Sequence, residues 1–343
     1  MKYLKDLARR NLKEKTAILR LDFNTEDNWR MAASVPTVHF LMKKCRSVVI
    51  LSHQGRPAGF EAPLSLRKKA LSLGKLIKKT VIFVPHFRFK DIRGLIDASP
   101  AGSVFLLENL RFLKGESENS AGLAKQLATL GDFYVNDAFA VSHRTAASVV
   151  SLPKLLPRYA GFELEAELKS LNRVMKNPRR PLVLILGGLK IEDKLDLARN
   201  LEKRASAFLI GGALTLGVLK RNIRKAIWPI DFRRENGVIK DIGEMTEKLF
   251  SGKIKSAKTV IWNGPVGDIG RKEFRSGTQA VARAIARNSA AFTIVGGGET
   301  VMFLKKLKLD KKIDFISTGG GAMLDFLAGK KLPGLAALES GKF

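Results

Sequence analysis

The sequence predicts an α/β protein: two doubly wound, Rossmann-like domains with parallel sheets, joined by an interdomain helix and a hinge. Short apolar runs rich in β-branched residues alternate with longer segments of helical spacing, which is the pattern of βαβ units. The runs form two sets separated by one helical segment, which indicates two domains. The 343 residues, 45% of them hydrophobic, suffice for two cores.

The first set of strands lies in the amino-terminal half. Its helical segments, 36–44 and 120–130, alternate with apolar runs. The runs predict strands at 17–22, 47–52, 80–84, 103–107 and 132–135. We assign residues 1–160 to this first domain.

The second set follows a helical segment at 163–175, which we take as the interdomain helix within 161–177. Pro178 and Pro181 end that helix and precede the next strand. The second domain, 178–329, is expected to contain strands 182–186, 207–210, 259–262, 291–295 and 313–317 and helices 278–287 and 300–307. A hinge is expected around 158–178 and near 317–321.

The chain carries a formal net charge of +29, which is not confined to a tail. Residues 1–160 hold 27 basic and 13 acidic side chains, a net of +14, so about half of the charge lies in each half of the chain. One interpretation is attraction of anions, either phosphorylated metabolites or nucleic acid. The other is a surface composition without a specific partner, because net charge says little about fold or site.

A single cysteine, Cys45, excludes an intramolecular disulfide and favours a reducing compartment. No apolar run approaches the ~18 residues of a membrane helix. The first ten residues lack the apolar core of a signal peptide. We therefore expect a cytoplasmic protein without membrane contact, in which Cys45 is a buried structural residue.

Polar residues gather where the predicted strands end, and open α/β sheets bind ligands at the carboxyl ends of their strands. In the first half these residues are mostly basic, and arginine forks match carboxylate and phosphate oxygens in pairs. The candidates are Asp22, Asn24, Arg30, His53, Arg56, Arg111 and Arg144. Their pattern favours a small, multiply charged anion as the ligand of the first domain.

The second half places glycine turns and lysines at the corresponding positions. Two stretches, 184–194 and 292–300, begin as apolar runs and break at glycines where a helix should start. Glycines let backbone N–H groups approach an anion, and a helix N-terminus adds partial positive charge. Lys190 and Lys194 lie four residues apart, on one helical face. Because neither GxxxxGK[ST] nor an intact GxGxxG occurs, the interpretation as a polyphosphate site depends on this context.

Nine segments occur in an order and spacing that match one known family. They are LRLDFN (19–24), RMAASVPTV (30–38), SHQGRP (52–57), LLENLRF (106–112), YVNDAFAVSHRTAAS (134–148), RRPLVLILGGLKIEDK (179–194), TVIWNGPVG (259–267), TIVGGGET (293–300) and FISTGGGAMLDFLAGKKLPGLAAL (315–338). On these motifs the chain resembles the phosphoglycerate kinases along nearly its whole length. In that family the last residues return to the first domain, so the resemblance adds 330–343 to that domain.

The resemblance implies a transferase that moves a phosphoryl group reversibly between 1,3-bisphosphoglycerate and ADP, giving 3-phosphoglycerate and ATP, with Mg²⁺ as cofactor and by in-line transfer after domain closure. The seven first-domain residues named above would bind the glycerate. The nucleotide site would comprise Gly188, Lys190, Lys194, Gly212, Asn263, Pro265, Gly296, Gly297, Gly298, Glu299 and Thr300. Arg30, Lys190 and Gly297 would be catalytic, and Glu299 would bind the metal ion. The family is usually monomeric, and we expect a glycolytic monomer.

The chain departs from the family pattern at three places. Glu299 stands where the family has aspartate, and its extra methylene is expected to lower Mg²⁺ affinity because Mg²⁺ geometry is strict. Gly270 stands where the family has a ribose-binding glutamate, which leaves the base preference open; Asp268 and Glu273 are the candidate replacements. The segment 212–258 and the loop 24–30 are shorter than usual, so the purine is expected to be more exposed.

Two alternatives remain open. A degenerate homologue would bind phosphoglycerate but transfer poorly; intact Arg30, Lys190 and Lys194 argue against it, whereas Gly270 and Glu299 argue for it. A nucleic-acid-binding protein would use the net charge of +29 and lose affinity at high salt. With three tryptophans and three tyrosines no stacking platform is evident, so nucleic-acid binding is expected only as a weak, non-specific side property.

Overall fold

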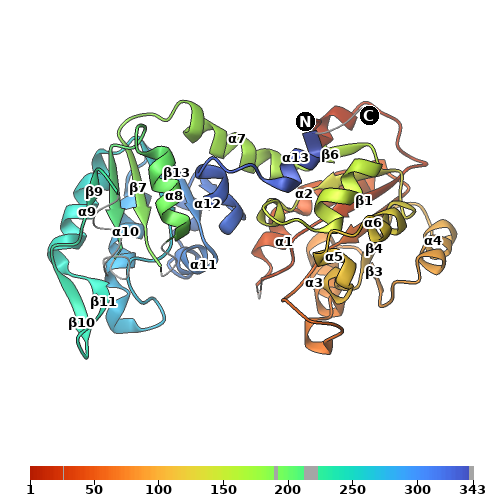
Figure 1. Cartoon of the computed structure of the whole chain (residues 1–343), viewed down its shortest axis with the longest axis horizontal. Helices are drawn as coiled ribbons and strands as arrows, with labels where there is room; N and C mark the ends of the chain where they lie inside the picture. Colours follow the sequence, from red (N-terminus) through yellow and green to blue (C-terminus); the bar gives the residue numbers. More distant parts are fainter. Residues whose placement is uncertain (26, 189–191, 212–222, 340–343) are drawn as a thin grey trace. The chain divides into compact units, whose positions relative to one another are not determined.

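The computed structural model describes residues 1–343 except 26, 189–191, 212–222 and 340–343. The chain divides into two compact units: unit 1 is Met1–Ala166 with Lys331–Phe343, and unit 2 is Glu167–Lys330. Each unit is built on a parallel six-stranded sheet with helices, which confirms the predicted fold class (Figure 1). The division falls within one helix, α7 (Phe162–Lys176).

Unit 1 has the strand order β3-β4-β2-β1-β5-β6, and all neighbouring strands are parallel. Every residue of the central strands β1, β2 and β4 is buried, as in sheets that helices cover on both faces. The strands are β1 (Thr16–Arg20), β2 (Ser47–Leu51), β3 (Val81–Val84), β4 (Ser103–Leu107), β5 (Phe133–Asn136) and β6 (Arg158–Ala160). Because β1 pairs with β2 on one side and β5 on the other, it marks the switch point of the sheet.

The helices of unit 1 include one from the far end of the chain. α13 packs against β6 and the turns that precede it, and Gly334 N donates to Ser142 O (2.8 Å). The helices of the unit are α1 (Trp29–Ala33), α2 (Val35–Lys44), α3 (Arg67–Ile77), α4 (Phe89–Ala98), α5 (Lys114–Ser117), α6 (Ala121–Ala128) and α13 (Pro333–Glu339).

Unit 2 has the strand order β14-β13-β12-β7-β8-β9, again parallel throughout. Its strands are β7 (Leu182–Leu186), β8 (Ala207–Ile210), β9 (Ala226–Ile227), β12 (Thr259–Asn263), β13 (Phe292–Gly296) and β14 (Phe315–Ile316). Its helices are α8 (Glu192–Leu201), α9 (Glu244–Ser256), α10 (Ser276–Arg287), α11 (Gly298–Lys306) and α12 (Gly321–Leu327). A separate antiparallel pair, β10 (Phe232–Glu235) and β11 (Val238–Ile242), lies outside the sheet.

The predicted strands agree with the observed ones to within two residues at each end. Three further elements of the structure were not predicted: β6, β9 and the pair β10–β11. β6 and β9 have three and two residues, too few for a periodic signal. The hairpin had a usable signal, Asn236-Gly237, whose φ angles of 48° and 78° suit a tight two-residue turn.

Two expectations from composition can be compared with the structure. Cys45 is buried (5% exposed), and burial raises its pKa to about 12, which agrees with a structural role. No helix among the described residues is both long enough and apolar enough to span a bilayer.

Two buried carboxyl groups give the stability a pH dependence. Burial raises the pKa of Asp137 to about 7, although Leu164 N donates to it (3.1 Å), and its Oδ2 has no hydrogen-bond partner within the described ranges. Burial also raises the pKa of Glu167 to about 7, although Ser317 Oγ and Thr318 Oγ1 donate to it (2.8 Å each). Both groups hold a proton in the folded chain that the unfolded chain releases at pH ~4.

We expect the free energy of unfolding to fall as the pH rises from 5 to 8. The folded pKa values lie above the unfolded ones, so the stabilisation is complete below pH ~4 and is lost as the pH passes ~7. Each group contributes on the order of 3 kcal/mol. Urea melts of Glu167→Gln, which cannot ionise, should show a weaker pH dependence than the wild type. The exposed-site control Glu61→Gln should keep the wild-type dependence. Equal wild-type stability at pH 5 and 8 would contradict this expectation.

Candidate functional site

The carboxyl ends of β1 and β2 are tied together, which fixes the loops that follow them. Leu21 N donates to Leu51 O (3.0 Å). Ser52 Oγ donates to Leu21 O (2.9 Å) and accepts from Phe23 N (3.1 Å). The predicted site residues that follow these two strands are therefore held at one edge of the sheet.

Asp22, Arg30 and His53 form one contact group at that edge. Arg30 Nη1 donates to Asp22 Oδ2 (2.7 Å), and His53 Nδ1 lies 3.9 Å from Asp22 Oδ1. Asn24 N donates to the same Oδ1 (2.9 Å). Within the described residues Arg30 Nε is buried without a hydrogen-bond partner, so this guanidinium has donor capacity left for a ligand.

Burial and neighbouring cations set the charge states of this group. Burial and Arg20 hold the pKa of His53 well below its usual range, although Asp22 raises it, so the ring is neutral at neutral pH. Burial alone would raise the pKa of Asp22, but adjacent positive charge lowers it below its usual range. Because His53 is neutral, we attribute that lowering to Arg30 and Arg20 rather than to the imidazole.

Arg20, at the end of β1, is a site residue that the sequence analysis missed. It is 2% exposed, and it donates from Nη2 to His53 Nδ1 (3.1 Å) and from Nε to Ser148 Oγ (2.9 Å). The buried Glu116 accepts from Ser148 Oγ (2.5 Å) and lies 3.9 Å from Arg20. Because arginine only donates, His53 Nδ1 accepts and the ring proton lies on Nε2. The available signal was an arginine within an apolar strand.

The loop after β2 is held through the backbone of Gly55. Gly55 N donates to Asn24 Oδ1 (2.8 Å), and Gly55 O accepts from Arg111 Nη1. Its φ is 67°, and a Cβ there would lie 2.6 Å from a methyl group of Leu64. Glycine is therefore required for the loop to connect Asn24 with Arg111.

Arg56, Arg111 and Arg144 complete the set predicted for the first domain. Burial lowers the pKa of Arg111, and the charges of Arg20 and Arg144 lower it further, so these cations lie near one another. Arg56 and Arg144 are exposed. Direct contacts therefore connect five of the predicted residues: Asp22, Asn24, Arg30, His53 and Arg111. The charge of Arg144 acts on the pKa of Arg111, which connects it to the same group. Arg56 follows Gly55 in the loop and is exposed to solvent. The excess of guanidinium groups over carboxylates suits a polyanion.

In unit 2, the turns after β7 and β12 cross at the switch point of the sheet. Gly187 N donates to Asn263 O (3.0 Å). A Cβ on Gly187 would lie 2.1 Å from Pro265 O, and a Cβ on Gly264, where φ is 88°, would lie 2.3 Å from Gly187 O. Side chains are therefore excluded at both glycines, and the two backbones approach each other directly.

The predicted residues Gly188, Lys194 and Pro265 lie at this crossing. Gly188 N donates to Pro265 O (2.8 Å), and its φ is 75°. Lys194, on α8, is 4% exposed, and its Nζ is 3.8 Å from the position of a Gly188 Cβ. The structure therefore places one ammonium group beside a glycine turn that a side chain would obstruct.

The turn after β13 leads into α11. Gly297, with φ 94°, precedes the helix, which begins at Gly298. A Cβ on Gly297 would lie 3.5 Å from Asn263 Nδ2 and 3.6 Å from both Gly264 N and Thr300 Oγ1. Within the described ranges Thr300 Oγ1 is buried without a hydrogen-bond partner. Together with the unpaired N–H groups of a helix N-terminus, these groups provide donors to an anion.

Glu299 is the predicted metal ligand, and it lies exposed in the first turn of α11. Among the described residues there is no cluster of three or more metal-ligating side chains. Mg²⁺ usually keeps several waters and is held by one or two carboxylates plus substrate phosphates. A single carboxylate beside the orphan hydroxyl of Thr300 fits a metal ion that arrives with a nucleotide.

Some predicted positions receive no structural account. Lys190 and Gly212 lie outside the described residues. Of the candidates for the ribose carboxylate, Asp268 accepts from Gly270 N (3.1 Å), and Glu273 lies 4.0 Å from Arg271 Nε. Both carboxylates therefore have protein partners.

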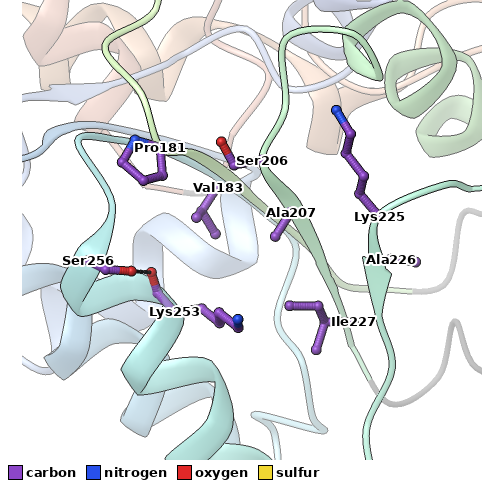
Figure 2. Close-up of a pocket in the computed structure, with 9 residues that line it drawn as sticks. All are labelled: Pro181, Val183, Ser206, Ala207, Lys225, Ala226, Ile227, Lys253 and Ser256. Carbon is purple, nitrogen blue, oxygen red and sulfur yellow. Dashed lines mark hydrogen bonds between the residues drawn. The ribbon is translucent and has the colours of Figure 1, made fainter.

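A cavity of about 400 Å³ lies elsewhere in unit 2 (Figure 2). Pro181, Val183 and Ala207 in its wall lie at the amino ends of β7 and β8, so the cavity is at the opposite edge from the glycine turns. Lys225 borders it, with Nζ donating to Glu202 O (2.9 Å) and Ala205 O (2.8 Å). This cavity is not the candidate site, because it lies at the amino edge of the sheet and its lining contains none of the strand-end glycines.

Comparison with known proteins gives a consistent result. The family model described as phosphoglycerate kinase matches residues 4–227 and 220–330. The phosphoglycerate kinase of Thermosipho africanus is 37% identical over 389 aligned positions, with 97% of each chain covered. That of Dictyoglomus turgidum is 35% identical, with 98% of this chain and 99% of the relative covered. Because 389 positions exceed 343 residues, the Thermosipho relative contains residues that this chain lacks.

Solved structures agree with the sequence relatives. The chain is similar to the crystal structure of phosphoglycerate kinase from Pyrococcus horikoshii OT3, with a TM-score of 0.88, 30% identity and coverage of 99% of this chain and 98% of the other. It is also similar to the phosphoglycerate kinase from Coxiella burnetii, with a TM-score of 0.80, 30% identity and coverage of 97% and 98%. The likeness therefore extends over both units.

Proposed function

Because the chain belongs to the phosphoglycerate kinase family, we propose that it transfers a phosphoryl group reversibly between 1,3-bisphosphoglycerate and ADP, giving 3-phosphoglycerate and ATP. The reaction is a step of glycolysis and gluconeogenesis. The observation that carries the proposal is the presence in one chain of a guanidinium-rich face in unit 1 and a glycine-rich anion site in unit 2. No covalent nucleophile is needed, since the substrate carboxylate attacks the phosphoryl group directly.

In the proposed mechanism unit 1 binds the glycerate. The seven predicted residues Asp22, Asn24, Arg30, His53, Arg56, Arg111 and Arg144 hold its carboxylate, hydroxyl and phosphate oxygens. Two features support a catalytic role for Arg30. Its Nη1 is held by Asp22, and its Nε has no hydrogen-bond partner among the described residues. His53 acts as a neutral Nε2–H donor because Arg20 occupies Nδ1.

Unit 2 binds the nucleotide in the same proposal. The nucleotide-binding residues are the predicted ones: Gly188, Lys190, Lys194, Gly212, Asn263, Pro265, Gly296, Gly297, Gly298, Glu299 and Thr300. Backbone N–H groups at Gly297 and Gly298 receive charge that develops on the transferring group. Glu299 would hold Mg²⁺, and the ion would supply positive charge to neutralise the phosphate oxygens.

Transfer requires the two ligands to meet, so we propose closure of the two units about a hinge at 158–178 and 317–321. Closure would exclude water and so limit hydrolysis of ATP. We further propose that the protein works as a cytoplasmic monomer.

The direct test is a coupled assay of ATP formation from 1,3-bisphosphoglycerate and ADP with Mg²⁺. The proposal expects turnover in the ordinary enzyme range, ~1–10³ s⁻¹. Tight binding of 3-phosphoglycerate by calorimetry without measurable turnover would refute it and favour a degenerate homologue. Rates measured side by side with ADP and with GDP would show whether the enzyme still prefers adenine with Gly270 in place of the family's glutamate.

Glu299→Asp is expected to lower the Mg²⁺ concentration needed for half-maximal activity. Aspartate removes one methylene, and Mg²⁺ tolerates little deviation from octahedral geometry at ~2.1 Å. The measurement is a Mg²⁺ titration of initial rates, with Glu244→Asp as a control at an exposed position in the same unit. The same change in both variants, or an unchanged Mg²⁺ requirement in Glu299→Asp, would remove Glu299 from the metal site. A higher requirement in Glu299→Asp alone would contradict the argument from side-chain length.

A further inference from the structure

The amino edge of the unit 1 sheet carries a dense group of basic side chains that the proposed reaction does not use. We name as the basic edge the side chains that precede β1, β2 and β3: Arg9, Arg10, Lys13, Lys15, Lys43, Lys44, Arg46, Lys78 and Lys79. The segments 8–15, 43–46 and 78–79 contain these nine basic residues and one acidic residue, Glu14. In a parallel sheet this edge is opposite the carboxyl ends, where the glycerate residues lie.

Backbone contacts connect these segments into one surface. Arg46 N donates to Lys15 O (2.9 Å), and Arg46 O accepts from Gly102 N (2.5 Å). Lys44 Nζ donates to Ala8 O (2.8 Å). Lys79 Nζ lies 3.1 Å from the position of a Gly102 Cβ. The basic edge is therefore continuous, from the segment before β1 to the segment before β3.

Few carboxylates neutralise this surface. Within the part of the chain that the structure describes, Lys15 is the one member with a carboxylate within 4.0 Å, at 3.2 Å from Asp132 Oδ1. Asp97, whose carbonyl binds Arg46 Nη2 (2.8 Å), pairs its carboxylate with Arg93 instead. The remaining charge is available to an external anion.

Helix ends explain part of this charge, and the rest needs another explanation. Lys43 and Lys44 lie in the last turn of α2, and Lys78 follows α3, where cations favour the helix dipole. Arg46 and Lys79 directly follow the C-cap residues of α2 and α3. Arg9, Arg10, Lys13 and Lys15 lie at no α-helix end. An edge that combines all nine goes beyond helix capping.

We propose that the basic edge binds the phosphate backbone of double-stranded nucleic acid without sequence preference. Strands lie ~4.8 Å apart, so the order β3-β4-β2-β1 gives the edge a length of about 14 Å. Duplex DNA has one charge per ~1.7 Å, so that length carries about eight phosphate charges. These eight or so phosphate charges are comparable in number with the nine basic side chains of the basic edge.

The composition of the edge argues against the other polyanionic surfaces. Its segments contain no aromatic residue, so they offer no platform on which single-stranded bases would stack. They also contribute no exposed large apolar side chain, which a membrane-inserting face would have. A duplex backbone, recognised by charge alone, fits better than either.

The test uses the full chain and a fluorescein-labelled DNA duplex of 20 base pairs, with binding followed by anisotropy between 50 and 200 mM KCl. We expect the plot of log K against log salt to have a slope of about −5 to −8, from six to nine phosphate contacts. The triple variant Arg10→Gln, Lys43→Gln, Lys79→Gln takes one exposed cation from each segment. It should bind at least tenfold more weakly at 100 mM KCl, with the slope reduced by about 3.

A matched control removes the same charge elsewhere. Lys272, Lys311 and Lys331 are exposed residues of other surfaces, and their triple change to Gln alters the net charge equally. This control should keep wild-type affinity within twofold, and both triple variants should keep the wild-type melting temperature and turnover. Equal losses in the two triple variants would mean that only total charge matters and would overturn the proposal.

Two competition arms separate this surface from the others. Displacement of the duplex by 3-phosphoglycerate would place binding at the guanidinium-rich face around Arg30 and refute the basic edge as its site. Phosphatidylserine vesicles that bind more tightly than the duplex would identify a membrane partner instead. Retained duplex binding in the presence of either competitor is the expected result.

Discussion

Arg30→Ala is expected to lower kcat by about 30- to 150-fold, which corresponds to ~2–3 kcal/mol, the scale for removal of one preorganised donor. Arg30 combines a fixed contact, Nη1 to Asp22 Oδ2 (2.7 Å), with a buried Nε that has no partner among the described residues. A guanidinium held on one side by a carboxylate loses little freedom when it binds the transferring phosphoryl group. The measurement is kcat and KM in the coupled assay.

The effect should appear mainly in kcat, because the proposed contact strengthens as charge develops in the transition state. Arg30→Lys keeps the charge but loses the planar fork, so it should recover only part of the rate. Arg88→Ala is the control: it removes an exposed arginine of the same unit that pairs with Asp91, and it should leave kcat unchanged. A normal kcat with raised KM in Arg30→Ala would reduce Arg30 to a binding role.

Gly187→Ala is expected to destabilise unit 2 by about 3 kcal/mol or more, because overpacking against backbone has little room to relax. The new Cβ would lie 2.1 Å from Pro265 O and 2.6 Å from Gly264 O. Neither carbonyl can move freely, since Pro265 O accepts from Gly188 N (2.8 Å) and Gly264 O accepts from Trp262 Nε1 (2.8 Å). For a unit of this size the melting temperature should fall by about 6–12 °C.

Gly252→Ala is the matched control in the same unit. Gly252 is exposed in the interior of α9, and a Cβ there would meet nothing within 4 Å. Alanine at a helix-interior position is favoured over glycine by up to ~1 kcal/mol, so this variant should melt slightly higher than the wild type. Scanning calorimetry of both variants checks the pair. A Gly187→Ala variant with the wild-type melting temperature would contradict this expectation, because it would show that the turns after β7 and β12 can move apart to admit a methyl group.

Local signals in the sequence were sufficient for most of the strands. The run Leu182–Leu186 is continuously apolar and ends at Gly187-Gly188, and the structure has β7 with these bounds and a turn at those glycines. The same reasoning located β4 and β8 at their observed bounds. It failed for β6 and β9, because edge strands of two or three residues depend on a neighbour rather than on their own periodicity.

The site was predictable in its residue types but not in its internal contacts. Strand-end positions identified Asp22 and His53, since a core does not require such side chains there. The role of Arg20 could not be read in the same way, because an arginine in a strand is acceptable only if partners neutralise it. Those partners, Ser148 and Glu116, lie 128 and 96 residues further along the chain than Arg20.

The sequence by itself determined the α/β class, the two sets of strands and the chemical types at their ends, because hydrophobic periodicity and glycine positions act over a few residues. Only the tertiary structure decided which of those ends meet. The neutral state of His53 follows from burial and from Arg20, and the need for glycine at 187 follows from the turn after β12. Both are effects of segments far apart in the chain, and their distances and dielectric surroundings exist only once the sheets have formed.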